Sequence, residues 1–266
     1  MIAELGTLVS RRELLFDFAW RDLRARYKGS ALGFAWHFVM PLSQLVVFWI
    51  LFGVLFGVRP RTLTGEQSYA IFLFVGLLPW TFFATALTSG ASAIVANGGI
   101  VKKVRLPLAL LPASAVLAAL VNFVLTLLVL VVVLAVFGPR HPEGLLYVPV
   151  LLLIQTVMGL GLAYLLSALN VFFRDVQHIL GVLLMAWYFL TPVLFPVSIV
   201  ADRPREELLL YANPMTAVIV GYQRALLDGE GPQWIALVWP AAFALLSLAF
   251  GAAYFTRSKD EFEAAL

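Results

Sequence analysis

The chain has 266 residues, of which 62% are apolar and only 12% are charged, with a formal net charge of +3. Soluble domains are about half apolar and about 25% charged, so this chain has too little polar surface to cover a water-soluble globule. The composition therefore excludes an ordinary soluble enzyme and predicts a protein embedded in lipid. The chain contains no cysteine, which excludes disulfides, thiolate metal sites and a cysteine nucleophile.

Residues 11–28, ahead of the first long apolar run, predict an amphipathic helix. At about 100° per residue, one face carries Glu13, Asp17, Arg21, Arg24 and Lys28, and another carries Leu15, Phe16, Ala19, Trp20, Leu23 and Tyr27. The polar lead is too long for a cleavable export signal. Such a helix lies in the membrane interface, either as an anchor on anionic lipid or as a docking surface for a cytoplasmic partner.

Six segments are long and apolar enough to cross the hydrocarbon core, which needs about 20 residues. They are residues 34–58, 69–95, 113–137, 147–170, 178–196 and 233–256. The fifth is the shortest and ends at Pro192 and Pro196, which predicts a break near one membrane face. The span interiors carry no Asp, Glu, Lys or Arg, only amides such as Gln44, Asn122 and Gln155, whereas a proton-driven transporter needs an ionisable relay there.

The distribution of basic residues predicts the orientation, because cytoplasmic connections are enriched in Lys and Arg. With the N-terminus inside, twelve of the 18 basic residues fall on the inner side: Arg11, Arg12, Arg21, Arg24, Arg26, Lys28, Lys102, Lys103, Arg105, Arg174, Arg257 and Lys259. The outer side holds Arg59, Arg61, Arg140, Arg203, Arg205 and Arg224. Both termini are therefore predicted to be cytoplasmic, in agreement with an even number of spans.

Two connections are more patterned than plain loops. Residues 97–112, on the inner side, hold a short basic amphipathic turn between Asn97-Gly98-Gly99 and the prolines Pro107 and Pro112, and a short rigid helix there could transmit force. Residues 197–232, on the outer side, predict two short helices, about 205–212 and 215–227, separated by Asn213-Pro214. They form either a hairpin that dips into the outer leaflet or a loop on the headgroups.

The sequence lacks the motifs of several enzyme classes. It has no G-x-x-x-x-G-K-[ST] loop, so this chain cannot hydrolyse ATP by that route. His37, His141 and His178 lie far apart without metal-ligand spacing, and no H-E-x-x-H or G-x-S-x-G motif occurs. The chain is predicted to change conformation without catalysing a reaction itself, with the energy supplied by another protein.

Four stretches, in this order along the chain, resemble the membrane subunits of ABC exporters for polysaccharides, which move O-antigen, capsule or teichoic acid chains. The resemblance covers about residues 11–256. The stretches are Arg24, Arg26, Tyr27, Lys28, Ser30, Leu32-Gly33, Trp36 and Pro41; Val101–Pro107 with Leu111-Pro112; Phe173-Arg174-Asp175 with Thr191-Pro192 and Pro196; and Asn213-Pro214-Met215 with Tyr222, Arg224 and Gly229.

The resemblance implies one permease domain, residues 1–266, of an all-α integral membrane protein. Its parts would be the six helices, the cytoplasmic interface helix 11–28, the coupling loop 97–112 and the re-entrant outside hairpin 197–232. It implies a multi-pass protein of the bacterial inner (plasma) membrane, surrounded by lipid. The chain would form a homodimer, bind two copies of a cytoplasmic ATPase and move a lipid-linked polysaccharide along the dimer axis. ATP and Mg would sit on the partner, with no cofactor in this chain and no nucleic acid.

The resemblance also implies roles for individual residues. ATPase coupling is expected of Arg21, Arg24, Arg26, Lys28, Lys102, Lys103 and Arg105. The outside gate is expected at Asn213, Pro214, Tyr222 and Arg224. Sugar rings stack on aromatic side chains, so the candidate channel wall is Trp36, Trp80, Phe82, Phe83, Trp187, Tyr188 and Phe189. Each of these also fits an ordinary interfacial aromatic belt.

Three other functions fit parts of the pattern. A permease of the same architecture for a drug or a lipid predicts a narrower and more apolar path. A membrane enzyme acting on polyprenyl-linked sugars requires charged residues clustered at one face to bind phosphate and metal, and the sequence offers no such cluster. A structural scaffold leaves the two cytoplasmic docking features unexplained.

Overall fold

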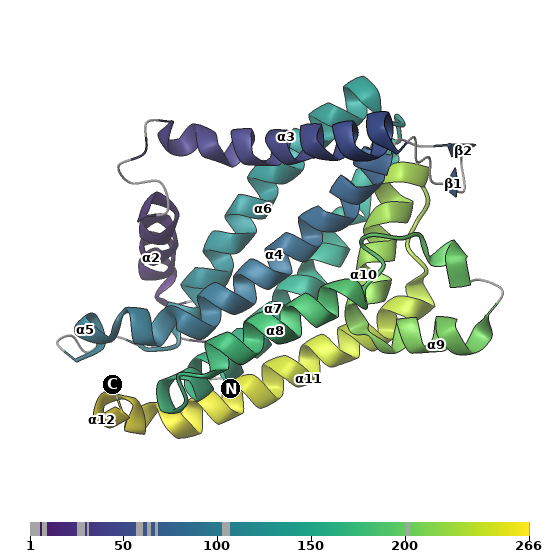
Figure 1. Cartoon of the computed structure of the whole chain (residues 1–266). Helices are drawn as coiled ribbons and strands as arrows, with labels where there is room; N and C mark the ends of the chain where they lie inside the picture. The colour runs from purple at the N-terminus through teal and green to yellow at the C-terminus, as the bar shows by residue number, and fades with distance from the viewer. Residues whose placement is uncertain are drawn as a thin grey trace.

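The computed structural model describes residues 6, 10–25, 30, 32–56, 61–62, 65–66, 69–102, 107–200 and 203–265. Helices dominate this part of the chain, and the prediction of an all-helical membrane fold is confirmed (Figure 1). The strands β1 (Arg61–Thr62) and β2 (Gly65–Glu66) form only a two-residue antiparallel ladder.

The helices fall into long, short and single-turn elements. The long ones are α3 (Trp36–Phe48), continued by the π-helix η2 (Trp49–Leu55), α4 (Tyr69–Ala96), α6 (Leu110–Phe137), α7 (Val148–Phe172) and α11 (Trp234–Ser258). The shorter ones are α2 (Arg12–Ala25), α5 (Gly98–Val101), α8 (Val176–Phe189), α9 (Pro204–Ala212), α10 (Pro214–Gln223) and α12 (Phe262–Ala265). Single turns are η1 (Gly33–Ala35), η3 (Pro142–Leu146), η4 (Val197–Val200), η5 (Arg224–Asp228) and η6 (Lys259–Glu261).

Five helical segments of the described chain are long and apolar enough to cross a membrane: Phe38–Leu55, Tyr69–Ala96, Leu110–Phe137, Pro142–Phe172 and Trp234–Glu261. The sixth apolar helix, α8, has 14 residues and is therefore only about 21 Å long, less than the ~30 Å hydrocarbon core. Its helical part ends at Phe189 rather than near 196, the predicted end of the fifth span. Pro192 lacks the N–H that a continuing helix would need.

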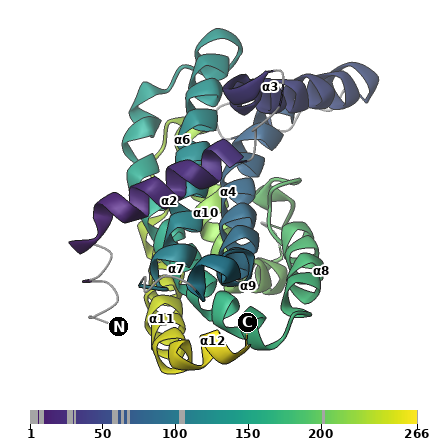
Figure 2. The ribbon, with the colours of Figure 1, turned by 90° about the vertical axis from the view of Figure 1, so that its left-hand side faces the viewer.

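Helix α4 is the centre of the bundle. It packs against α6 and α7 along its length and also contacts α3, α8 and α10. Almost every residue of α4 is at least partly buried, and its exposed positions are Thr81, Thr88 and Ala96. Figure 2 shows α3 and α8 on the same side of α4, with α2 crossing in front of the bundle.

Glycines allow a close contact between α7 and α11. A Cβ added to Gly161 would lie 2.3 Å from the backbone nitrogen of Leu248, and one added to Gly251 would lie 2.0 Å from the carbonyl oxygen of Gly161. Only glycine leaves room for backbones this close, as in other small-residue contacts between membrane helices.

Two amides on α7 link it to α4 inside the bundle. Gln155 donates its Nε2–H to the carbonyl of Pro79 at 2.6 Å, and Asn170 donates its Nδ2–H to the carbonyl of Ala91 at 3.0 Å. Since lipid cannot satisfy these amides, the bonds hold the register of the two helices. Gln155, one of the amides noted in the span interiors, thus has a structural role.

The bundle has two distinct ends. Helices α2, α5 and α12 gather at one, which we term the α5 end, whereas the β1–β2 ladder and α9 lie at the other, the α9 end (Figure 1). Lys102 and Arg174 line one cavity at the α5 end. Arg203, at the N-terminus of α9, lies at the opposite end. This separation agrees with the two sides assigned from the basic residues.

Candidate functional site

Helix α2 is the predicted amphipathic helix. Its Ala19 and Leu23 are buried against Ala118 of α6, while Phe16 and Trp20 stay exposed. Arg24 lies over the Trp20 ring, with 5.0 Å from its guanidinium carbon to the ring centroid. The helix is therefore docked on the bundle by a narrow apolar stripe and keeps a surface of aromatic and basic side chains. Arg26 and Lys28 lie outside the described residues.

Arg21 connects α2 to the predicted coupling loop. Its Nη2–H donates to Oδ1 of Asn97 at 2.8 Å and approaches Oδ1 of Asp22 at 3.3 Å. Asn97 in turn donates its Nδ2–H to the carbonyl of Ala93 at 2.8 Å, which fixes the orientation of the amide. The two segments expected to contact the ATPase are thus joined directly.

A cavity of about 350 Å³ opens next to α5. It is lined by Val95, Gly98, Gly99, Lys102, Val171, Arg174 and Ala265. This cavity is therefore lined by two cationic side chains, Lys102 from the coupling loop and Arg174 from the α7–α8 connection, together with the C-terminal segment. Lys103 and Arg105 lie outside the described residues.

The candidate aromatic side chains divide into separate groups. Trp80 and Phe83 of α4 are buried against Trp187 of α8, with ring centroids 6.3 and 5.2 Å from it. Tyr188 also packs on Trp80, at 5.6 Å, and only Phe189 is widely exposed, at 58%. Trp80 and Phe83 were candidates for a channel wall or an aromatic belt; in the structure they are buried and join α4 to α8.

The hairpin region consists of α9, α10 and η5 at the α9 end. Asn213 is the N-cap of α10, where its Oδ1 accepts from the backbone N–H of Met215 at 2.9 Å, and Pro214 occupies the first helical position. On α9, burial raises the pKa of the Tyr211 phenol above its usual value and the nearby Glu207 carboxylate raises it further, against a smaller lowering by Arg224.

Asn213 also binds the end of α8. Its Oδ1 accepts from the indole N–H of Trp187 at 2.7 Å, and its Nδ2–H donates to Oγ1 of Thr191 at 2.8 Å. The Thr191 hydroxyl donates to the carbonyl of Trp187 at 2.7 Å. Two stretches that carry the family resemblance, Thr191-Pro192 and Asn213-Pro214, therefore meet in one hydrogen-bonded cluster.

The other predicted gate residues are placed differently. Tyr222 is completely buried, with its ring centroid 6.0 Å from that of Phe123 on α6. Arg224 forms an ion pair with Glu230 at 2.5 Å. Tyr222 therefore anchors α10 in the core and has no free surface with which to meet a substrate.

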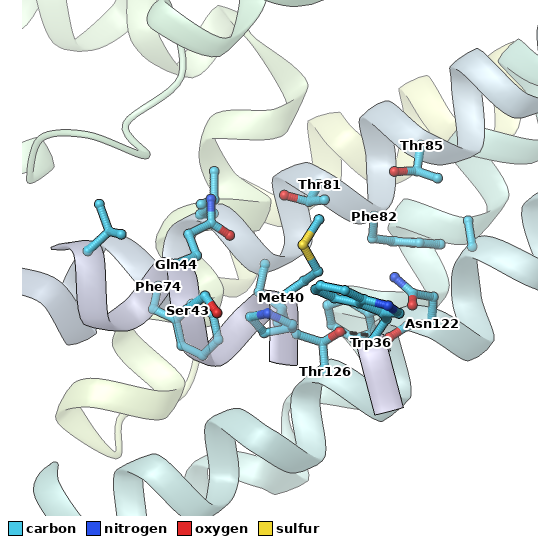
Figure 3. Close-up of a pocket in the computed structure, with 16 residues that line it drawn as sticks. Trp36, Met40, Ser43, Gln44, Phe74, Thr81, Phe82, Thr85, Asn122 and Thr126 are labelled. Atoms are coloured by element: carbon cyan, nitrogen blue, oxygen red, sulfur yellow. Dashed lines mark hydrogen bonds between the residues drawn. The ribbon is translucent and has the colours of Figure 1, made fainter. Parts of the chain in front are cut away.

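A further cavity, of about 480 Å³, lies between α3, α4 and α6 (Figure 3). Two candidate aromatics, Trp36 and Phe82, line it. The polar side chains around it are Ser43 and Gln44 from α3, Thr81 and Thr85 from α4, and Asn122 and Thr126 from α6. Sequence reasoning missed the hydroxyls, although Thr81 and Thr85 are four residues apart and so share one helix face.

No group of three His, Cys, Asp or Glu residues within the described part of the chain is arranged to hold a metal ion. What the described residues offer is a polar cavity within an apolar helix bundle, a basic end tied to α2, and a hydrogen-bonded cluster at the α9 end.

Comparison with known proteins identifies the family. The chain matches the family model described as ABC-2 type transporter over residues 13–227. It is 37% identical over 262 residues to the O-antigen export system permease protein RfbA of Myxococcus xanthus, covering 98% of each chain. It is 27% identical over 252 residues to the RfbA protein of Klebsiella pneumoniae, covering 94% of this chain and 93% of that one. It is 26% identical over 243 residues to the polysialic acid transport protein KpsM of Escherichia coli, covering 91% of each. Since the family model spans most of the chain and a relative aligns almost end to end, this chain belongs to the ABC-2 type transporter family.

Proposed function

We propose that this chain is the membrane subunit of an exporter that moves a lipid-linked polysaccharide across the bacterial inner membrane, powered by ATP on a separate chain. The observation that carries the proposal is the near full-length similarity to permeases named for O-antigen and polysialic acid. The span interiors, which hold amides and hydroxyls but no charged residue, fit passage of a hydroxyl-rich chain.

A partner ATPase accounts for the missing nucleotide-binding loop. Its contact surface in this proposal is the α5 end, where α2 is bonded to Asn97 and Lys102 faces the cavity beside Arg174. Closure of two ATPase subunits on ATP would move α2 and α5 together, because they are joined, and the spans would follow as rigid bodies.

A homodimer is supported by the surface of α3 and η2. Val46, Val47 and Trp49 are more than half exposed, as are Val54 and Leu55 further along. In this proposal a second copy covers part of that surface, and the path for the polymer runs along the dimer axis.

The proposed topology has six crossings with both termini inside. It counts α8 together with the turns that follow it as the fifth crossing, and α2 and α12 lie at the same end of the bundle (Figure 1). The helices α9 and α10 then lie at the outer face, where they would form the gate. The Asn213 cluster and the buried Tyr222 would hold that gate to the bundle.

Purification of the tagged chain from its own host membranes, followed by mass spectrometry, tests the partner. We expect two copies of this chain with two copies of an ATPase. Deletion of the gene should trap polysaccharide in the cytoplasm and deplete it from the cell surface, with restoration by the wild-type gene.

Two results would contradict the proposal. If the chain purified alone under several mild detergents, the hypothesis of an ATPase partner would be contradicted. Unchanged surface polysaccharide in the deletion strain, with the efflux of a drug or lipid impaired instead, would assign the other substrate class.

A further inference from the structure

We propose that the cavity between α3, α4 and α6 binds sugar residues of the transported polymer during passage. The inference rests on the proposed function, since it assigns a binding site to that substrate. The residues it adds are Ser43, Gln44, Thr81, Thr85 and Asn122, which act beside the aromatic side chains of Trp36 and Phe82.

The size and position of the cavity fit a ligand. Its volume of about 480 Å³ lies within the range of about 300–1,000 Å³ that is usual for small-molecule sites. Trp36 and Gln44 lie eight positions apart on α3, so the lining extends about 12 Å along that helix. The wall is built from three helices, with Thr81 and Thr85 on α4 and Asn122 on α6 (Figure 3).

The polar side chains of the lining are not satisfied by the protein. Within the described part of the chain, the side chains of Gln44 and Asn122 form no hydrogen bond, nor do the hydroxyls of Ser43, Thr81 and Thr85. Unpaired amides are costly at membrane depth, because lipid tails offer neither donor nor acceptor. The cavity therefore favours a ligand that carries hydrogen-bonding groups.

The aromatic side chains further restrict the chemical class of the ligand. A sugar ring presents C–H faces that stack on an indole and hydroxyls at its edge that bond amides, and Trp36 offers both a ring and an N–H. Phe82 supplies a second apolar wall, supported by Phe123 at 5.4 Å between ring centroids. An acyl chain or an apolar drug would leave the amides unpaired, whereas a carbohydrate can occupy both kinds of surface.

A row of hydroxyls connects the cavity with the α5 end. Thr81, Thr85, Thr88 and Ser92 follow one another at spacings of three or four residues and so share one face of α4. Thr88 donates to the carbonyl of Ala84 at 2.9 Å and Ser92 to that of Thr88 at 3.1 Å, which leaves the hydroxyl oxygens as acceptors. A polymer entering from the α5 end would meet these acceptors before it reached the cavity.

The natural absence of cysteine makes accessibility a direct test. Single variants Thr81→Cys and Thr85→Cys are treated with a water-soluble maleimide in host membranes that make the polymer and in membranes where its synthesis is blocked. We expect labelling without polymer and labelling slowed several-fold with polymer. Leu128→Cys, on a 55% exposed site of α6, is the control that should resist labelling in both membranes.

A lack of labelling at both cavity positions in both membranes would overturn the inference, because a dry cavity is filled by lipid or by a second copy. Labelling at the same rate with and without polymer would overturn it as well, because the polymer then does not enter the cavity.

Export by amide-free variants is the second test. The double variant Gln44→Met and Asn122→Leu nearly conserves volume and removes both amides. We expect about a tenfold loss of export rate, with unchanged or higher thermal stability and unchanged ATPase binding. Thr256→Val, which removes a hydroxyl from α11, should export normally. If the double variant exported at the same rate as the unchanged chain, the proposed site would be wrong, but the proposed exporter function would stand. If the unchanged chain exported no polysaccharide, the proposed function itself would be wrong.

Discussion

The guanidinium of Arg21 donates a hydrogen bond to Oδ1 of Asn97, 2.8 Å away, across 76 positions of sequence. The contact joins the surface helix α2 to the point where α4 ends and α5 begins. Because Asn97 is itself bonded to the last turn of α4, the proposed mechanism would pass movement of α2 to the central helix of the bundle through this contact. Helix α2 and the α4–α5 junction are therefore joined by consecutive hydrogen bonds.

Arg21→Ala should uncouple ATP hydrolysis from export with little loss of stability. The bond is solvent-exposed, and a typical hydrogen bond contributes only about 0.5–1.5 kcal/mol to folding. We expect normal assembly with the ATPase and a several-fold fall in polymer exported per ATP hydrolysed, measured in inverted vesicles. Arg12→Ala is the matched control, because it removes a positive charge from the first turn of the same helix. An equal effect of the two variants would assign the loss to the charge of α2 rather than to the contact.

Lys102→Glu should weaken docking of the ATPase. Lys102 and Arg174 share the cavity at the α5 end, so reversing one charge changes the local potential presented to a partner. We expect less ATPase to co-purify, with the difference from wild type largest at low ionic strength, where charges are least screened. Arg140→Glu, a reversal at the α9 end, should leave co-purification unchanged. Retention of the full ATPase complement by Lys102→Glu would exclude a contact there.

The sequence predicted the helices better than their contacts. Composition and length located the long helices, and Asn213-Pro214 marked the boundary between α9 and α10 because a capping residue followed by proline has a local signature. The break after α8 was expected from its prolines, although the helix ends several residues earlier than predicted. These features depend on residues that are neighbours in sequence, which is why pattern alone located them.

Side-chain placement was less predictable, since α4 is apolar on nearly all faces. Trp80 and Phe83 were candidates for a free wall but pack against α8. Tyr222 was a candidate gate residue but is fully buried. An aromatic residue near a span end looks the same in sequence whether it faces lipid, substrate or a neighbouring helix. Thr81 and Thr85 carry no signal in the sequence, because the cavity that they line forms only where α3 and α6 meet α4.

Asn213→Ala should loosen the hairpin at the α9 end. The change removes the N-cap of α10 and the bonds to Trp187 and Thr191, so we expect a loss of about 1–2 kcal/mol of stability. Faster proteolysis of the α9–α10 region in detergent is the measurement. Asn213→Asp keeps an acceptor for Met215 and the indole but cannot donate to Thr191, so its loss should be smaller. Equal losses from the two variants would mean that the donated bond carries the effect.

Gly161→Ala and Gly251→Ala should each destabilise the packing of α7 on α11. In both cases the new Cβ would meet backbone rather than a flexible side chain, at 2.3 Å for Gly161 and 2.0 Å for Gly251, so the helices must move apart. Such overpacking costs about 1–3 kcal/mol, and we expect a lower temperature of thermal unfolding in detergent. Gly159→Ala is the matched control on α7, because its Cβ would make only an ordinary contact with Ala86 at 3.7 Å. If Gly159→Ala lowered the unfolding temperature as much as Gly161→Ala, a general intolerance of added volume on α7 would explain the loss, and the close crossing of α7 and α11 would not.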